Sequence, residues 1–292
     1  YYLSNKYILK YVNKLFIKSY HLLSLYSINK MKKIAYIILI TIFFSCNGYQ
    51  KIVKSNDVEL KYLMAKKYYN DNEYFKALPI LDELQTLFKG TVKAEEVDYL
   101  LAYTHYGLGS NMLASYKFKL FNLTHPYSKY NEELAYMSAY CYYLESPKYS
   151  LDKTNTLKAI HELQSFIDKY PQSEKVDTCN SLIDNLTIKI HKKVFGIAKL
   201  YYDIEDYNAA ITALNNVIID YPTIDNQSEI QFLILDSNFK LAVNSINSKK
   251  IERFNNTIAS YRFFTKNFPN DNRIKEANNI YEKSIKQLEN FQ

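Results

Sequence analysis

AKLYYDIEDYNAAITALNNVIIDYP, residues 198–222, is the clearest copy of a unit that recurs along this chain. In its second half, the small residue Ala210 is followed by apolar residues at +4 and +7 and by Pro222 at +12. The first three of these positions share one helical face, and proline ends a helix because it lacks an N–H and clashes with the preceding turn. The unit therefore predicts a helix, a turn over residues 203–208, a second helix and a proline stop.

The same spacing occurs four times in all, and a looser copy lies upstream. The four copies are Ala114, Phe118, Phe121 and Pro126; Ala159, Leu163, Phe166 and Pro171; Ala210, Leu214, Val217 and Pro222; and Thr257, Tyr261, Phe264 and Pro269. The looser copy consists of Ala77, Leu81 and Leu84 and ends at Lys89-Gly90. A fixed internal period specifies stacked helical pairs, which serve as binding scaffolds far more often than as enzymes. An irregular helical bundle is the alternative.

A small residue also lies twelve positions upstream of three copies: Ala65 before Ala77, Ala102 before Ala114, and Ala198 before Ala210. This order of helix, tight turn, helix and proline resembles the tetratricopeptide repeat. We therefore expect an all-α fold, an α-solenoid of about five tetratricopeptide-like helix pairs with a C-terminal capping helix over residues 271–288. Asp271 is the expected N-cap of that last helix.

Two repeats depart from the pattern, and both departures predict loops. In the third repeat, an insert from Glu145 to Thr154 that contains Pro147 separates the two helices. In the fifth repeat, the sequence predicts a long turn from Asn244 to Arg253.

The start of the chain carries a targeting signal. The chain begins with Tyr1, and Met31 is its first methionine. Residues 31–45 combine two lysines, an apolar run that is short for a transmembrane helix, and Ser45 before Cys46. They resemble a bacterial lipoprotein signal peptide, which makes Cys46 the expected lipidation site. An uncleaved apolar anchor is the alternative.

This signal sets the expected domain boundaries and the charge of the mature chain. We expect residues 1–30 to be an upstream extension outside the mature protein, 46–56 to be a lipidated tether, and 57–290 to be the tetratricopeptide repeat domain. Seven of the 37 basic residues lie within residues 1–33, so the remainder carries 30 basic and 30 acidic residues. A nearly neutral mature chain argues against a nucleic-acid partner.

The sequence predicts no catalytic residue, metal site or cofactor. The chain has five glycines and lacks phosphate-binding, nucleophile-elbow and zinc-protease motifs. His161-Glu162 is an isolated pair on an expected helix surface. Cys141 and Cys179 fit buried free thiols or, in an oxidising compartment, a disulfide. We therefore expect a protein that is not an enzyme.

Thirty tyrosines, with no tryptophan, are the remaining signal. Tyrosine suits a binding groove because it offers contact area and a polar tip at a low entropic cost. The expected substrate-binding surface consists of Tyr68, Tyr69, Tyr74, Tyr103 and Tyr106. Core packing combined with compositional bias is the competing explanation.

Several stretches resemble the BamD family of lipoproteins, in particular its Bacteroidetes branch. They are residues 65–69 (AKKYY), 74–79 (YFKALP), 99–103 (YLLAY), 137–144 (MSAYCYYL), Ser146-Pro147 with 149–152 (YSLD), and 157–160 (LKAI). The resemblance covers roughly Cys46 to Leu288, and the Ser-Pro insert is its most discriminating part.

The resemblance implies a subunit of the outer-membrane β-barrel assembly machine, held in the outer membrane by its lipid with its repeats in the periplasm. Its N-terminal repeats would receive unfolded barrel precursors. Its C-terminal repeats would dock on a BamA-like barrel insertase, alongside other assembly subunits. Two rival functions stay open: another periplasmic repeat adaptor, such as a cell-division coordinator, and a glycan-binding surface lipoprotein.

Overall fold

The computed structural model describes residues 48–290, and within that range the chain is helical and contains no strand. Cys46, the signal predicted over residues 31–45 and the extension 1–30 lie outside the described residues. The chain divides into two compact units, with the boundary after Leu108. No helix among residues 48–290 is both long and apolar enough to cross a membrane.

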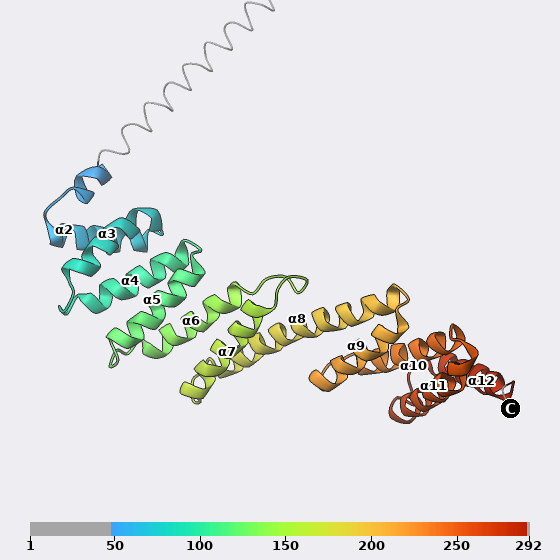
Figure 1. Ribbon diagram of the computed structural model, residues 1–292. Coiled ribbons are helices and arrows are strands. Elements are labelled where there is room, and N and C mark those ends of the chain that lie inside the picture. The colour runs from blue at the N-terminus through green and yellow to red at the C-terminus, as the bar shows by residue number, and fades with distance from the viewer. Residues whose placement is uncertain (1–47, 291–292) are drawn as a thin grey trace, which may run out of the picture. The chain divides into compact units, whose positions relative to one another are not determined.

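The first unit contains three labelled helices (Figure 1). They are α2 (Val58–Asn70), α3 (Tyr74–Leu87) and α4 (Ala94–Gly107). α3 packs against both α2 and α4 around one apolar core. A shorter helical segment, residues 48–53, adds Tyr49, Ile52 and Val53 to the edge of this core. Part of the segment expected to be a tether therefore packs against the first unit.

The second unit contains the other eight labelled helices of the described chain. They are α5 (Asn111–Thr124), α6 (Asn131–Leu144), α7 (Thr154–Lys169), α8 (Val176–Asp203), α9 (Tyr207–Asp220), α10 (Gln227–Val243), α11 (Asn247–Asn267) and α12 (Ile274–Glu289). Each helix packs against its neighbours in the chain, and α10 also contacts α8 and α12. The order and bounds of the helices along the chain follow the predicted repeat pattern, and the expected final helix comes last. The predicted all-α repeat fold is thus confirmed.

The small residues of the repeat pattern are all buried. Each is at most 1% exposed: Ala65, Ala77, Ala102, Ala114, Ala159, Ala198, Ala210 and Thr257. The prolines follow helix ends as predicted. A proline lies two residues after the end of α5, α7, α9 and α11. The insert of the third repeat forms the loop between α6 and α7, as the sequence predicted.

The tight turns inside three pairs share a backbone feature. Two residues after α2, α4 and α8 end, the chain adopts a left-handed conformation, at Asn72, Gly109 and Glu205. This conformation lets the next N–H groups satisfy the last carbonyls of the helix, as Glu73 N–H does to Tyr68 at 2.8 Å. Glycine adopts it freely and asparagine tolerates it, whereas glutamate does so at a cost.

The predicted turn from Asn244 to Arg253 is wrong, because α11 already begins at Asn247. Two side-chain contacts favour the additional helical turns. Lys249 pairs with Glu252 three residues later, at 3.6 Å. The guanidinium of Arg253 donates a hydrogen bond to the Ser245 hydroxyl. These contacts are invisible to a search for turn-forming residues alone.

Asp271 is not the N-cap of the last helix, because α12 begins at Ile274 with Arg273 in the cap position. The Asp271 carboxylate instead accepts the backbone N–H of Arg273 at 2.9 Å and its guanidinium at 2.6 Å. Asp271 therefore closes the turn before the helix. Ala277 and Ile280 form the buried face of this helix.

Cys141 and Cys179 are free, buried thiols. Burial raises the pKa of Cys141 to about 12, to which the Glu145 carboxylate adds, and raises the pKa of Cys179 to about 11. A thiol with such a pKa is almost entirely protonated at neutral pH and is a poor nucleophile. Both residues thus act as small apolar side chains in the core of the second unit.

We predict that neither thiol reacts with a thiol-specific reagent at pH 8 in the folded protein, and that both react once the chain is unfolded in urea. The reason is that only the thiolate attacks the reagent and burial suppresses it. Absorbance of the released thiol chromophore gives the count. Reaction of either cysteine in the native protein would contradict its burial.

Replacing Ala210 with leucine should destabilise the protein by about 1–3 kcal/mol, because the larger side chain overfills the space between α9 and its neighbours. Ala259→Leu is a matched control: Ala259 is exposed on α11, so its effect should stay within about 0.5 kcal/mol. The urea midpoint of the helical circular-dichroism signal measures both. Equal midpoints for the two variants would show that the small residue is not needed.

Candidate functional site

The five tyrosines predicted to bind substrate all lie in the first unit, on α2, α3 and α4. Tyr68 is 8% exposed and packs edge-on against Tyr49 at a centroid distance of 5.8 Å. Tyr68 is therefore a core residue and cannot belong to an accessible surface. Tyr69, Tyr74, Tyr103 and Tyr106 are each partly exposed. We call these four residues the tyrosine surface.

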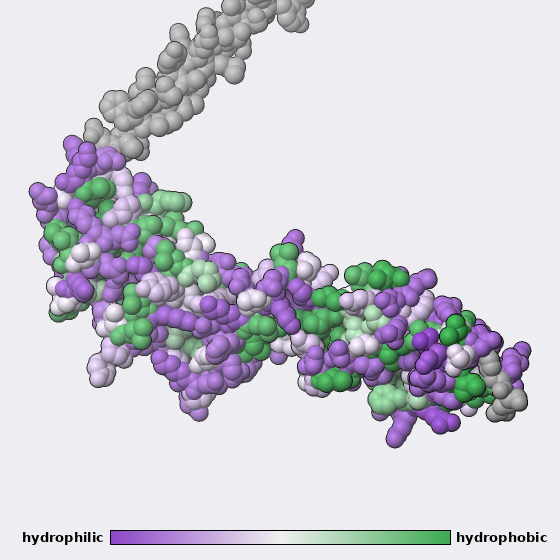
Figure 2. Space-filling view, viewed as in Figure 1, coloured by the Kyte–Doolittle hydropathy of each residue, from purple (hydrophilic) through white to green (hydrophobic). Residues whose placement is uncertain are grey.

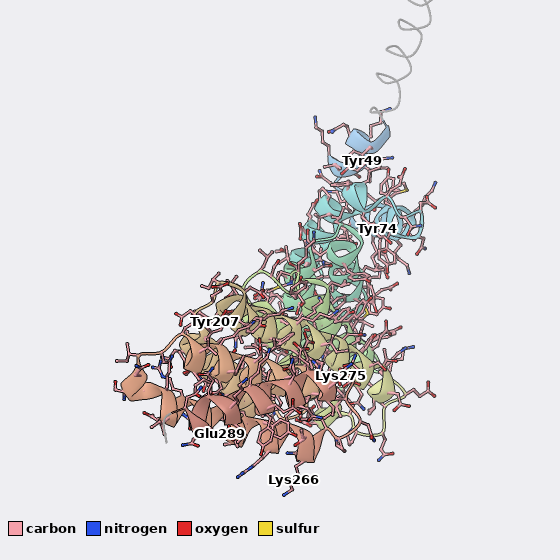
Figure 3. All side chains as sticks on the ribbon, turned by 90° about the vertical axis from the view of Figure 1, so that its right-hand side faces the viewer. Tyr49, Tyr74, Tyr207, Lys266, Lys275 and Glu289 are labelled. Carbon is pink, nitrogen blue, oxygen red and sulfur yellow. The ribbon has the colours of Figure 1, made fainter. Side chains whose placement is uncertain are left out.

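Tyr69 and Tyr74 lie on either side of the turn between α2 and α3. Their rings meet edge to face, with centroids 5.8 Å apart. The Tyr74 hydroxyl donates a hydrogen bond to the Asn72 side-chain oxygen at 2.7 Å. This hydrogen bond ties the Tyr74 ring to Asn72, the residue that adopts the left-handed conformation in the turn. Figure 3 shows Tyr49 and Tyr74 near the N-terminal end of the described chain.

Tyr103 and Tyr106 form a row along α4 that begins at Tyr99. The centroids of Tyr99 and Tyr103 are 4.8 Å apart, and those of Tyr103 and Tyr106 are 6.4 Å apart. Residues three and four apart lie on one helical face, so the row follows from the sequence spacing. The row ends at Gly107, the last residue of α4.

Gly107 lets the pair Tyr69 and Tyr74 lie next to the pair Tyr103 and Tyr106. A methyl group added at Gly107 would lie 2.4 Å from the Tyr74 ring. Only glycine therefore lets that ring lie against the end of α4. The structure thus places Tyr74 of α3 directly beside the residue that follows Tyr106.

A pocket of about 530 Å³ opens beside this junction. It is lined by Asn72, Glu73, Tyr74, Phe75, Lys76, Gly107 and Leu108. The two charged residues of the lining form an ion pair, with the Lys76 ammonium 2.8 Å from the Glu73 carboxylate. This hydrogen bond raises the pKa of Lys76. What the pocket offers is chiefly aromatic and apolar surface, the kind that holds apolar side chains.

Phe75 is the residue that the sequence analysis missed. It is 83% exposed and lies at the pocket beside Tyr74. A signal was present, since Phe75 precedes Ala77 by two residues and therefore lies off the buried helical face. An exposed aromatic side chain at such a position contributes little to the core and enlarges the apolar surface beside Tyr74.

Polar contacts hold α4 against α2 and so keep the tyrosine surface in place. The Tyr62 hydroxyl donates to the Glu96 carboxylate, and the Lys66 ammonium contacts the same carboxylate at 2.6 Å. Burial opposes the ionisation of Glu96, but the donors Lys66 and Tyr62 outweigh it, so the pKa of Glu96 lies below its ordinary value. Lys93 at the start of α4 contacts Glu59 of α2 at 2.6 Å.

Among residues 48–290, no group of three or more His, Cys, Asp or Glu side chains could hold a metal ion. His161 and Glu162 lie on α7: His161 contacts the Ser165 hydroxyl, and Glu162 pairs with Lys119 at 2.6 Å. What the tyrosine surface can do chemically is bind apolar and aromatic groups.

Gly107→Ala should fail to stabilise the protein and should shift the Tyr74 ring, because the new methyl group would overlap it. Gly196→Ala is the matched control, since Gly196 lies inside α8 and an added methyl group there meets no atom within 4 Å. That control should raise the stability by about 0.5–1 kcal/mol. Urea midpoints and the tyrosine near-ultraviolet signal distinguish the variants. Equal stabilisation by both would contradict the Tyr74 contact.

Comparisons with solved structures give a distant likeness. One solved structure, the tetratricopeptide repeat domain of P58(IPK), shares 16% sequence identity with this chain. The match covers 83% of this chain and 68% of that one, with a TM-score of 0.38. No curated protein matches the sequence significantly.

The decisive comparison is with a family of sequences. The model of the YfiO family, described as outer membrane lipoprotein, matches residues 55–254. This match spans more than half of the chain, runs from the first turn before α2 into α11, and includes the tyrosine surface. The protein belongs to the YfiO (BamD) family of outer membrane lipoproteins.

Proposed function

We propose that this protein is a non-enzymatic scaffold of the machinery that assembles β-barrel proteins in the outer membrane. Two findings support the proposal: membership of the YfiO family, and an array of helical pairs, an architecture that serves for binding. The observation that carries it is the tyrosine surface beside the pocket of the first unit.

The tyrosine surface, together with Phe75, receives unfolded barrel precursors. An extended precursor strand that ends in an aromatic residue would place that side chain in the pocket beside Tyr74. The adjoining row of Tyr103 and Tyr106 would contact further residues of the strand. Aromatic pairs contribute about 0.5–1.5 kcal/mol each beyond the area that they bury. Tyr68 is left out of this surface because it is buried.

The remaining parts of the chain complete the scaffold. Lipid on Cys46 holds the protein in the outer membrane, with the helices of residues 57–290 in the periplasm. The C-terminal repeats dock on a BamA-like barrel insertase, together with other assembly subunits. The protein thus accelerates assembly by holding a precursor near the insertase, without chemistry of its own.

The double variant Tyr69→Ala/Tyr103→Ala should bind a peptide with the C-terminal strand of a barrel precursor about tenfold or more weakly, because truncating an aromatic hot spot costs more than about 1 kcal/mol. Tyr149→Ala is the control, since Tyr149 is 54% exposed in the second unit. Fluorescence anisotropy measures the affinity, and circular dichroism checks that the helices are intact.

Both variants should also be tested in cells, by the fraction of barrel proteins that reach the heat-resistant folded form. The double variant should lower this fraction, whereas Tyr149→Ala should not. If the double variant binds and assembles normally with its helices intact, the tyrosine surface is not the receiving site.

A further inference from the structure

α8 carries a largely apolar seam along its length. Along this 28-residue helix, residues recur at alternating spacings of four and three. This is the heptad pattern by which one helix packs lengthwise on another. The seam consists of Cys179, Ile183, Leu186, Ile190, Lys193, Ile197, Leu200 and the C-cap residue Ile204.

The first half of the seam is covered within the chain. Cys179 and Leu186 are fully buried in a cluster that includes Leu163 and Phe166 of α7. Ile190 is 5% exposed. A helix, α7, is therefore what covers this half of the seam.

The second half of the same seam is bare. Ile197 is 51% exposed, Leu200 57% and Ile204 62%, and Tyr201 beside them is 39% exposed. Single exposed apolar residues are normal on a protein surface, but three consecutive seam positions form a stripe. Figure 2 shows hydrophobic residues gathered over the C-terminal end of α8.

The loop between α6 and α7 sets the boundary between the two halves. The Lys193 ammonium donates to the Leu151 carbonyl, and the Lys189 ammonium donates to the Ser146 hydroxyl at 3.2 Å. The loop is thus held on α8 at the point where the bare stripe begins. The Leu151 side chain, 57% exposed, adds an apolar residue at that end.

The charges along one edge of the stripe are arranged so that they attract the same edge of a second, antiparallel copy. Lys192, Gly196, Lys199 and Asp203 follow one another along it, again at spacings of four, three and four. If two such helices run antiparallel about a two-fold axis near residues 198–199, Asp203 of each lies between Lys192 and Lys199 of the other. Gly196 lies opposite Asp203 in this arrangement, and the space around its Cα is open.

We propose that the bare stripe of α8 packs against the same stripe of a second copy of this chain, with the two helices antiparallel. Ile197 of each copy then lies opposite Leu200 of the other, and Ile204 lies opposite the aliphatic stem of Lys193. Such a contact is isologous and closes on itself. Its small area makes it weak in solution, and confinement of both copies to one membrane raises their effective concentration.

Disulfide cross-linking in cell envelopes tests this arrangement with the full chain. One copy carries Ile197→Cys and a differently tagged copy carries Leu200→Cys, and mild oxidation should join the two tags. The buried native thiols do not compete. Ile188→Cys paired with Leu200→Cys is the matched control, because Ile188 is 41% exposed on the opposite side of α8 and should give no cross-link.

Two further tests distinguish the proposed antiparallel contact from a parallel or nonspecific contact between copies. Ile204→Cys in both copies should not cross-link, since these residues lie at opposite ends of the contact. Asp203→Lys should lower the yield of the joined tags, and adding Lys199→Asp should restore it. The proposal is overturned if the two tags are joined no more than in the Ile188 control, if Ile204→Cys joins them, or if the cysteines join only to another protein.

Discussion

Close packing at the small-residue positions is the constraint on which the rest of the structure depends. Ala77, Ala114, Ala159 and Ala210 are fully buried, and a side chain as small as alanine lets the neighbouring helix pack closely at these points. That approach lets the bulky residues at +4 and +7 fill the space on either side, as Phe118 and Leu163 do. Because each helix contacts mainly its neighbours in the chain, the core of each unit is built from a series of such local contacts and not from one central cluster.

A fold built in this way leaves one side of many helices free for binding. In the first unit, Val97 and Leu101 of α4 are buried in the core, whereas Tyr103 and Tyr106 of the same helix are partly exposed. Gly107 lets Tyr74 of the preceding helix, α3, lie against the end of α4 beside Tyr106. Residues on the partly exposed face can therefore vary with less effect on the packing than the buried small residues.

The helices could be predicted well from the sequence because each repeat contains several independent signals for the same helix. Small residue, apolar face and proline agree in four of the five copies, so the order of the helices follows from local pattern alone. Features that depend on single side-chain contacts were not predictable. The early start of α11 depends on contacts of Lys249 and Arg253, and the position of Asp271 before α12 depends on Arg273. The burial of Tyr68 depends on Tyr49, which comes from a segment that has no repeat pattern.

If the protein acts by binding within a barrel-assembly complex, it should be recovered together with its partners. Isolation of the native lipoprotein from membranes in mild detergent, followed by mass spectrometry of the partners, tests this directly. We expect recovery of a large outer-membrane barrel protein that carries periplasmic domains, at near-stoichiometric amount. Recovery of cell-division or peptidoglycan-associated proteins instead, or of no partner at all, would contradict it.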